Sequence, residues 1–402
     1  MRIIYLHQYF NTPDMPGSTR SYELAKRLVK NGHQVMMITS KRDAHQKLSM
    51  RWTNEDGIQV CWIPVSYSNK MGFFRRIISF ISFSIKSAKV CLSINADLLF
   101  ATSTPLTIAI PGIYFSKIKN KPMVFEVRDL WPEIPIALGA LKSRLTIKLA
   151  KWLEKVTYHN SEQIIALSKG MKAGVVKTGF PSEKVHVITN LSNMTHFASK
   201  QVSEKLKIKG FDWGASNPLV IYTGALGHVN DVTYLIKVAD HMRKINPSVK
   251  FIIAGEGVEK VRTIELAKNL QLLNNTIFII DPIQKYYIPQ LFFRANIVTS
   301  LFLDWEVLRH NSANKFFDGL AAGKPIMINY SGWQREILEK NQAGFYVPHD
   351  DTEKGARILN EILKDRDRQK LMGESARQLA EEKYSIDVQF PKFENVLKTA
   401  LN

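Results

Sequence analysis

The side chains best suited to chemistry lie in one stretch late in the chain, residues 303–329. Free backbone N–H groups at a predicted helix start, the positive end of the helix dipole and a lysine together favour an anion such as a diphosphate. Asp318 lies one turn after Lys315 on the same face, where its carboxylate can accept hydrogen bonds from a sugar diol. The stretch alone also allows an ordinary capped helix with a Lys–Asp surface pair. The clustered polar residues are His310, Asn311, Ser312, Lys315 and Asp318.

The same stretch predicts the elements that position these side chains. Ser312 is the expected N-cap, because its hydroxyl can accept a free backbone N–H of the first helical turn. Gly323 is expected to end the helix, where a left-handed residue is usually needed. Residues 326–328 then form a short buried strand. Between the helix ends, apolar residues recur at helical spacing: Phe316, Phe317, Leu320 and Ala321.

A second candidate region lies at the beginning of the chain. Residues 2–6 and 34–39 read as strands on either side of a helix at 21–30, which is a βαβ unit. Its first loop falls at the carboxyl edge of a parallel sheet, where α/β folds bind ligands. Gly17 would let the backbone approach a substrate, and Arg20 could reach it. The loop has no GxGxxG pattern, so its nucleotide signal is weak.

Charge also follows directly on a buried strand within residues 122–133. Arg128, Asp129 and Glu133 stand at or just beyond the carboxyl end of this strand. Charge in that position is costly unless it is used, which predicts a site. The alternative is a simple salt bridge between Arg128 and Asp129.

The second half of the chain restarts the same architecture after a polar, irregular linker at 192–217. Residues 218–231 read as a strand, a glycine loop and a helix start. Gly224 and Gly227 allow close backbone approach, and His228 and Asn230 are placed to donate hydrogen bonds. A chain of 402 residues exceeds what one core usually supports, so we expect two domains.

The formal net charge of +19 is unevenly distributed. Residues 1–190 hold 27 Lys and Arg against 12 Asp and Glu, whereas the rest of the chain holds 28 against 24. A basic half implies an anionic partner, which could be nucleic acid, anionic lipid or a phosphorylated substrate.

The two cysteines, Cys61 and Cys91, lie in apolar surroundings without metal-ligand spacing, so core roles in a reducing compartment are expected. The first ten residues do not resemble a signal peptide.

One basic segment has the composition of a membrane-surface helix. Residues 57–96 contain no acidic residue, and within them residues 69–89 combine Lys and Arg with Phe and Ile. The apolar run between Arg76 and Lys86 is too short to span a bilayer. Such a helix can lie in the membrane interface, or it can be a crossover helix buried in a Rossmann-like half. We expect a mixture, with one face in the core and one face on lipid.

Together these residues resemble glycosyltransferase family 4, retaining sugar transferases with the GT-B fold, over essentially the whole chain. The similarity is strongest to the branch of N-acetyl-L-fucosaminyl transferases from bacterial O-antigen and capsule assembly. The motifs that carry it are Gln8-Tyr9-Phe10 with Gly17 and Arg20, Leu28-x-x-x-Gly32-His33-x-Val35, residues 127–133, Gly224-x-Leu226, Gly255-x-Gly257 and residues 312–325.

The resemblance implies an α/β GT-B architecture, with two Rossmann-like parallel-sheet domains facing a central cleft. We expect an N-terminal acceptor- and membrane-facing domain at 1–195 and a nucleotide-sugar-binding domain at 196–380. A C-terminal helix at 381–402 is expected to cross back onto the first domain.

The resemblance also implies a retaining hexosyltransferase. It would move a sugar such as N-acetyl-L-fucosamine from a UDP-sugar to a polyprenyl-diphosphate-linked saccharide, during O-antigen or capsule assembly. No cofactor and no metal are expected. The enzyme would work peripherally on the inner face of the bacterial cytoplasmic membrane, with residues 69–89 touching anionic lipid.

The site roles follow from that resemblance. Asp318 would bind the ribose hydroxyls, while Lys315 and the helix start would neutralise the leaving diphosphate. The predicted catalytic residues are Lys315, Asp318, Arg128, Asp129 and Glu133. The predicted substrate-binding residues are Gly17, Arg20, Gly224, Leu226, Gly227, His228, Asn230, Gly255, His310, Asn311 and Ser312.

The sequence departs from the family pattern at two positions. The family usually has a Glu eight residues before the helix carboxylate, where this chain has His310. The glycine loop of the family usually carries a Lys that binds the diphosphate, and Asn230 stands in its place. Lys315, Arg20 and Arg128 are the cations that could compensate.

Two other functions fit parts of the sequence. A UDP-sugar epimerase of the GT-B fold would also bind a nucleotide sugar between two such domains, but it has no use for a lipid-facing helix. A nucleic-acid binder would suit the net charge. However, no nucleic-acid-binding motif or aromatic RNA-binding pattern appears, so no nucleic-acid partner is expected.

Overall fold

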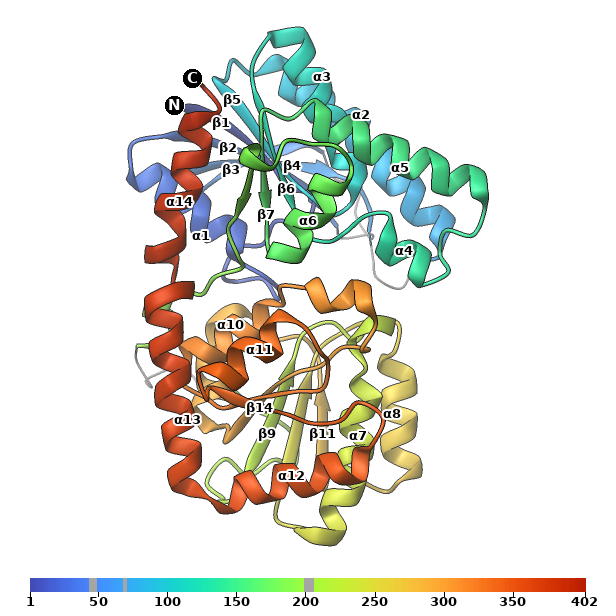
Figure 1. Cartoon of the computed structure of the whole chain (residues 1–402), viewed down its shortest axis with the longest axis vertical. Helices are drawn as coiled ribbons and strands as arrows, with labels where there is room; N and C mark the ends of the chain where they lie inside the picture. Colours follow the sequence, from blue (N-terminus) through green and yellow to red (C-terminus); the bar gives the residue numbers. More distant parts are fainter. Residues whose placement is uncertain (43–48, 68–70, 199–205) are drawn as a thin grey trace.

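The computed structural model describes residues 1–42, 49–67, 71–198 and 206–402. The chain forms two α/β units, each built on a largely parallel sheet covered by helices on both faces (Figure 1). The two units face each other across the middle of the molecule. This confirms the expected fold class, two parallel-sheet domains in a GT-B arrangement.

The N-terminal unit contains an eight-stranded sheet in the order β3-β4-β2-β1-β5-β6-β7-β8. Only buried residues occupy β5, β6 and β7, as expected for parallel strands covered on both faces. β3 runs antiparallel to β4 at the sheet edge, a strand that the sequence patterns did not predict. The strands are β1 (Arg2–Leu6), β2 (Gln34–Lys41), β3 (Arg51–Glu55), β4 (Ile58–Pro64), β5 (Leu98–Thr102), β6 (Met123–Val127), β7 (Gln163–Ala166) and β8 (Val185–Val187).

Helices pack on both faces of this sheet. α2, α3, α5 and α6 share one apolar core with the sheet, and α1 packs on the opposite face. Both cysteines lie buried and unpaired on the first of these faces, as their apolar surroundings predicted. The helices are α1 (Arg20–Lys30), α2 (Phe73–Ser93), α3 (Ala109–Lys119), α4 (Glu133–Ala137), α5 (Arg144–His159) and α6 (Lys169–Lys177).

The C-terminal unit contains a six-stranded parallel sheet in the order β11-β10-β9-β12-β13-β14. One face packs against α9, α10, α11 and α13, and the other against α7, α8 and α12. The strands are β9 (Leu219–Thr223), β10 (Lys250–Ala254), β11 (Ile277–Ile280), β12 (Ile297–Ser300), β13 (Ile326–Ile328) and β14 (Gly344–Tyr346). The helices are α7 (Val232–Ile245), α8 (Lys260–Asn269), α9 (Ile288–Arg294), α10 (Asn314–Ala321), α11 (Trp333–Lys340), α12 (Thr352–Lys364) and α13 (Arg366–Leu379).

The last helix, α14 (Ile386–Thr399), returns to the N-terminal unit. It continues the path of α13 along one side of both units, so that the two chain ends lie close together (Figure 1). The Phe393 ring packs edge-on against Phe100, with 5.0 Å between ring centroids. The N-terminal core therefore includes side chains from the far end of the sequence.

Both sheets place a loop at the point where the strand order reverses. β1 pairs with β2 on one side and β5 on the other, and β9 pairs with β10 and β12. The loops that follow β1 and β9 therefore open at the carboxyl edges, in the crevice where such sheets bind ligands. These two loops carry Gly17 and Gly224.

Candidate active site

A pocket of about 540 Å³ lies between the two units. The first unit contributes the loop after β1, including Gly17, and Arg42. The second unit contributes the ends of β9 and β10, the loop after β11 and the start of α10. The lining residues used below are Gly17, Gly224, Asn230, Gly255, Lys285, Phe302, Lys315 and Asp318.

Two of the predicted glycines, Gly224 and Gly255, line this pocket at positions where a larger residue would not fit. Gly224 has a φ of +136°, which side chains rarely adopt, and a Cβ there would lie 3.2 Å from Cε of Lys315. A Cβ on Gly255 would lie 2.0 Å from the Gly224 carbonyl oxygen. The backbones of the two loops therefore approach each other and the pocket closely.

Lys315 is the buried cation of the pocket. Its Nζ donates a hydrogen bond of 2.8 Å to the Tyr222 hydroxyl and lies 4.0 Å from the centroid of that ring. The same Nζ lies 5.2 Å from the Phe302 ring centroid. Burial lowers the pKa of Lys315 to about 7, because the charged form loses its hydration. A bound anion would favour the charged form of this lysine.

Asp318 also faces the pocket, but its partner is not Lys315. Lys285 Nζ lies 2.5 Å from Asp318 Oδ2, and both side chains are about nine-tenths shielded from solvent. The alternative of a Lys315–Asp318 surface pair is therefore wrong, because both side chains are buried and each has another partner.

The residues just before α10 are placed differently from the prediction. Helix α10 begins at Asn314 with Ala313 as its N-cap, one residue later than expected, so Ser312 is not its N-cap. Ser312 Oγ accepts the Asn190 backbone N–H at 3.1 Å, which joins the two units. The Asn311 side chain donates to the Leu308 carbonyl oxygen at 2.6 Å. These groups are committed to backbone partners, and neither residue lines the pocket.

His310 likewise lies at the contact between the two units. Its carbonyl oxygen accepts a hydrogen bond of 2.7 Å from Ser168 Oγ. A Cβ on Gly170 would lie 2.0 Å from His310 Nδ1, so the imidazole fills the space that Gly170 leaves at the start of α6. This contact explains a glycine that the sequence patterns did not single out.

Arg20 does not reach the pocket with its guanidinium, which corrects the sequence-based expectation. The group donates two bonds to Glu126 Oε1 at 2.7 and 3.2 Å, and both side chains are fully buried. It also donates to the Thr189 carbonyl oxygen at 2.7 Å. Burial alone would raise the pKa of Glu126, but Arg20, Arg128 and Thr102 hold it below its usual value. Arg20 therefore joins α1, β6 and the chain segment that leads into the second unit.

The three charged residues that follow β6, Arg128, Asp129 and Glu133, lie in the N-terminal unit, outside the pocket described above. Arg128 Nη1 is 3.3 Å from Nε2 of the buried His7. Burial raises the pKa of Asp129 to about 6, although the nearby Arg128 charge opposes this. The Glu133 carboxylate has a buried oxygen with no hydrogen-bond partner within the described residues. No Arg128–Asp129 salt bridge occurs in the described part of the chain, so these three residues remain candidates for acceptor contacts.

The remaining residues of the glycine loop divide into two groups. Asn230 lines the pocket, and its Oδ1 accepts the Gly227 backbone N–H at 3.2 Å. Leu226 is fully buried in the core on the α7 face. His228 is exposed and its Nδ1 lies 2.5 Å from Glu259. Leu226, Gly227 and His228 thus shape the loop and are absent from the pocket lining.

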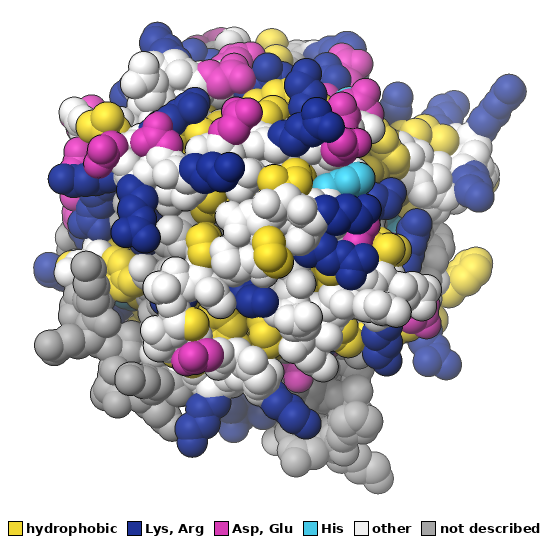
Figure 2. Space-filling model, turned by 90° about the horizontal axis from the view of Figure 1, so that it is seen from below, with side chains coloured by type: hydrophobic (Ala, Val, Ile, Leu, Met, Phe, Trp, Pro, Cys, Tyr) yellow, Lys and Arg dark blue, Asp and Glu magenta, His cyan; other side chains and the backbone are white. Residues whose placement is uncertain are grey.

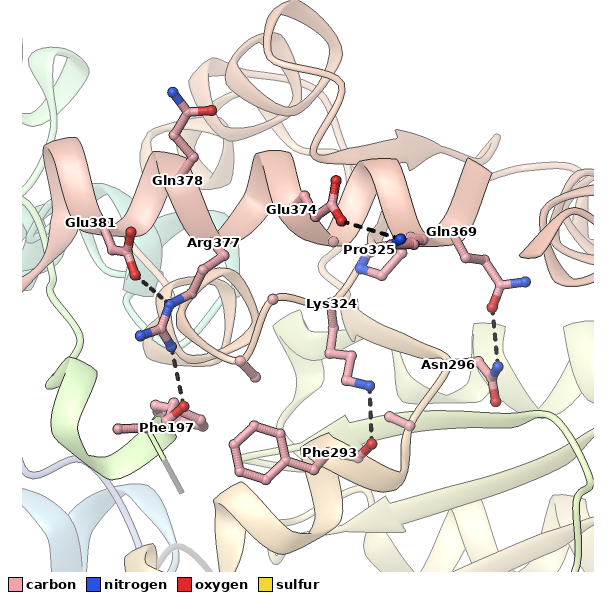
Figure 3. A pocket seen from close by; sticks show the side chains of 16 residues that line it. Phe197, Phe293, Asn296, Lys324, Pro325, Gln369, Glu374, Arg377, Gln378 and Glu381 are labelled. Carbon is pink, nitrogen blue, oxygen red and sulfur yellow. Dashed lines mark hydrogen bonds and ion pairs between the residues drawn. The ribbon is translucent and has the colours of Figure 1, made fainter. Parts of the chain in front are cut away.

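A larger pocket, of about 620 Å³, lies at the other edge of the C-terminal sheet (Figure 3). Asn296 and Pro325 in its lining precede β12 and β13, so this is the amino edge of the parallel strands. Its cations already have protein partners: Lys324 donates to the Phe293 carbonyl oxygen at 3.0 Å and Arg377 to that of Phe197 at 3.2 Å (Figure 3). Arg377 also donates to the Ala321 carbonyl oxygen at 2.6 Å. These bonds satisfy carbonyl groups near helix ends. We therefore place the candidate site in the pocket between the units.

Sequence reasoning did not single out Lys285, which lines the pocket between the units, or Tyr222, whose hydroxyl accepts a hydrogen bond from Lys315. Lys285 lies five residues after the end of β11. Arg128 was identified because it is a charged residue at the carboxyl end of a strand, and the same rule could have identified Lys285. Tyr222 reads only as a core strand residue, and its hydroxyl donates to the Ala225 carbonyl oxygen at 2.6 Å while accepting from Lys315. Only the folded structure shows that this tyrosine connects the glycine loop to Lys315.

The comparison with known families agrees with this geometry. Residues 17–193 match the family described as Glycosyltransferase Family 4, and residues 204–379 match Glycosyl transferases group 1. A protein of Escherichia coli (strain K12) named for glycosyl transfer in colanic acid biosynthesis is 21% identical over 291 residues. This alignment covers 68% of this chain and 70% of that protein.

Solved structures of similar fold cover nearly the whole chain. Anabaena HepE in complex with UDP-glucose superposes with a TM-score of 0.70 at 16% identity, covering 99% of this chain and 100% of HepE. WaaG, a glycosyltransferase involved in lipopolysaccharide biosynthesis, gives a TM-score of 0.69 at 14% identity, covering 99% and 98% of the two chains. With its family 4-like domain followed by a group 1 domain, the chain is a glycosyltransferase of the GT-B fold, a hexosyltransferase.

Proposed function

We propose that this glycosyltransferase moves a sugar from a UDP-sugar donor to a polyprenyl-diphosphate-linked saccharide in bacterial surface-polysaccharide assembly. The observation that carries the proposal is the pocket between the units, where Lys315, Asp318 and the backbones of Gly17, Gly224 and Gly255 meet. The similarity to proteins named for colanic acid and lipopolysaccharide biosynthesis supports the polysaccharide pathway. The donor sugar that we propose is an N-acetylated deoxyhexosamine such as N-acetyl-L-fucosamine.

The donor diphosphate is assigned to the floor of the pocket. Glycine at positions 224 and 255 lets the phosphate oxygens approach backbone atoms, and Lys315 supplies a desolvated positive charge from the first turn of α10. A cation in a shielded site interacts with developing negative charge more strongly than one in water. Lys315 therefore stabilises the UDP leaving group, and it replaces the lysine that the family usually carries near Asn230.

We assign a retaining reaction, with both substrates on one face of the sugar. The acceptor hydroxyl forms its bond to the anomeric carbon while the bond from that carbon to the diphosphate oxygen breaks. The departing phosphate oxygen takes the proton of the attacking hydroxyl, so the reaction does not need a basic side chain of the protein. Arg128, Asp129 and Glu133, at the N-terminal unit's strand edge, would orient the acceptor.

A lipid-linked acceptor would meet the enzyme at a membrane surface, and three helices of the N-terminal unit suit that contact. α3 contacts both α2 and α5, and all three pack on the same sheet face. Phe74, Ile78, Ile81 and Ile85 expose one face of α2. Leu145, Leu149 and Trp152 do the same on α5. The single acidic residue of these helices, Glu154, is buried. Asn69 and Lys70, at the start of the predicted membrane segment, lie outside the described residues.

This membrane surface is apolar and basic together, as in helices that lie in the headgroup region. Exposed Arg75, Lys86 and Lys89 on α2 accompany Arg144, Lys148 and Lys151 on α5. By contrast, Lys and Arg alternate with Asp and Glu on the end of the molecule formed by the C-terminal unit (Figure 2). Within the described residues, the helices do not include one with the length and apolar character of a bilayer span. The proposal therefore assigns a peripheral contact with anionic lipid on the cytoplasmic face.

The proposal is tested by a donor screen against polyprenyl-diphosphate sugars extracted from membranes, with products read by mass spectrometry. We expect one UDP-sugar to add its glycosyl mass to the lipid-linked acceptor. In the same assay, Lys315→Ala should lower turnover by a factor of about 100 or more while the variant stays folded. Near-normal turnover of Lys315→Ala would remove the role of this lysine. If no donor is consumed with any lipid-linked acceptor, the proposed acceptor class is wrong.

A simple control distinguishes the proposed glycosyltransferase from a UDP-sugar epimerase of the same fold. An epimerase would change the UDP-sugar in the absence of acceptor, and the change would be visible by NMR. We expect no such conversion, because the apolar, basic face on α2, α3 and α5 favours a lipid-linked acceptor.

A further inference from the structure

The ion pair between Lys285 and Asp318 lies inside the proposed donor pocket. The Nζ–Oδ2 distance is 2.5 Å, and the two side chains are 10% and 11% exposed. Both residues line the pocket, together with Lys315. The family resemblance assigns the ribose hydroxyls to Asp318 but gives Lys285 no role, although Lys285 is the charged partner of that carboxylate.

Lys285 also lies where the two units touch. Its neighbour Gln284 forms an antiparallel backbone bridge with Pro16, directly before Gly17 in the first unit's loop. A narrow crevice beside the main pocket is lined by Ser18, Thr19, Lys285 and Asp318. The segment that carries Lys285 is therefore held from both sides, by its own domain and by the loop after β1.

A carboxylate in such a shielded position is costly without a compensating charge. Lys285 occupies Oδ2, and a lysine can donate three hydrogen bonds but accept none, so it holds the carboxylate as an acceptor. The second oxygen, Oδ1, is the one that we assign to a ribose hydroxyl. Lys285 thus fixes the rotamer of Asp318 before a nucleotide arrives.

Resting on the proposed function, we infer that Lys285 is a positioning residue for nucleotide binding, which acts through Asp318 to select the ribose diol. The main-chain bridge from Gln284 to Pro16 makes this pair sensitive to contact between the two units. Lys285 is not assigned to the reacting atoms, so its loss should weaken donor binding much more than it slows the chemical step.

The experiment measures binding of UDP and 2′-deoxy-UDP by isothermal titration calorimetry, with GDP and ADP as base controls. In the wild-type protein, loss of the 2′-hydroxyl should weaken binding about tenfold, because a hydrogen bond to a charged group is lost. Lys285→Met should weaken UDP binding about tenfold or more and reduce the preference for UDP over 2′-deoxy-UDP to about twofold. Lys285→Arg, which keeps a cation near Asp318, should restore part of this preference.

Two further variants test whether Lys285 acts through Asp318. In the Lys285→Met/Asp318→Asn double variant, the loss of UDP affinity should not exceed that of the worse single variant, because both changes disrupt one unit. Lys184→Met is the matched control, since Lys184 forms a 2.7 Å pair with Glu162 on the exposed surface of the N-terminal unit. Its UDP affinity and ribose preference should be unchanged. A thermal melt with each titration shows that the variants are folded.

The outcomes separate this inference from the proposed function. A folded Lys285→Met variant that keeps the full preference for UDP over 2′-deoxy-UDP would overturn the role of Lys285 while leaving the glycosyltransferase intact. Tighter UDP binding by Lys285→Met would also overturn it, because the pair would then compete with the ligand. If the wild-type protein binds none of UDP, GDP and ADP, the donor assignment itself fails.

Discussion

Lys315 and Tyr222 form a cation–hydroxyl pair in the pocket, with the ammonium 2.8 Å from the hydroxyl oxygen and 4.0 Å from the centroid of the ring. The tyrosine hydroxyl is oriented by its own bond to the Ala225 carbonyl oxygen. A residue of α10 is thereby connected to the glycine loop that follows β9, the first strand of the same sheet in chain order. This pair links the charge of the site to the loop that shapes it.

The first prediction concerns the pH dependence of donor binding. The pKa of Lys315 is lowered to about 7 in the free protein, and a bound diphosphate would raise it by favouring the charged form. UDP affinity should therefore be constant below about pH 7 and fall as pH rises further, by up to about tenfold per pH unit. Titrations from pH 6.5 to 9, in buffers of different ionisation enthalpy, would also detect proton uptake on binding.

The control for this pH dependence is Lys315→Met, which should bind UDP more weakly and without the change near neutral pH. A wild-type affinity that does not vary between pH 7 and 9 would contradict the assignment of Lys315 to the diphosphate.

The second prediction concerns Arg20, which the structure assigns to stability. Arg20→Met leaves Glu126 buried without its cation, which should lower the free energy of unfolding by about 3–5 kcal/mol. Urea denaturation followed by circular dichroism measures this loss. Adding Glu126→Gln to the variant should recover part of the stability, because the unpaired charge is then removed. A fully stable Arg20→Met protein with greatly reduced turnover would instead support direct substrate contact.

The third prediction concerns the membrane surface formed by α2, α3 and α5. Changing Leu149 and Trp152 together to Asp removes apolar area and adds negative charge on an exposed helix face. Binding to vesicles rich in anionic phosphatidylglycerol should fall about tenfold or more, with little change in the free energy of unfolding. Vesicle sedimentation measures the effect, with neutral phosphatidylcholine vesicles for comparison.

A matched control for this surface is Leu371→Asp, since Leu371 is 64% exposed on α13 of the other unit. This variant should bind vesicles as the wild-type protein does. Equal binding by the α5 double variant and the wild type would exclude α5 from the contact.

The fourth prediction concerns Glu154, buried beneath the exposed face of α5. Burial raises its pKa to about 8, and nearby Glu133 adds to the shift. Between pH 4.5 and 8 the native state holds a proton that the unfolded chain lacks, so stability should decrease as pH rises through this window. Glu154→Gln should remove this dependence and raise the free energy of unfolding at pH 8 by about 1–2 kcal/mol. Denaturation at pH 5, 6.5 and 8 checks the slope, and an identical slope in both proteins would contradict it.

Much of the fold could be predicted because its signals are local. Continuous apolar runs such as residues 251–254 and 277–280 indicate strands buried on both faces, and the helices between them have apolar residues at helical spacing. Of the glycines predicted to allow close approach, Gly17 and Gly224 line the pocket and Gly227 does not, whereas Gly255, predicted as a substrate-binding residue, lines it too. The edge strand β3 was missed because its half-exposed residues lack a clear alternation.

By itself, then, the sequence determined the two-sheet architecture, the position of the loops at the carboxyl edges and two of the α10 residues that line the pocket, Lys315 and Asp318. Only the tertiary structure decided which partner each charged side chain has. Arg20 lies 106 residues from Glu126, and Lys285 lies 33 residues from Asp318. Hydrophobic periodicity reports which face of an element is buried, but the pairing of charges depends on which elements pack together, and that is settled by the fold as a whole.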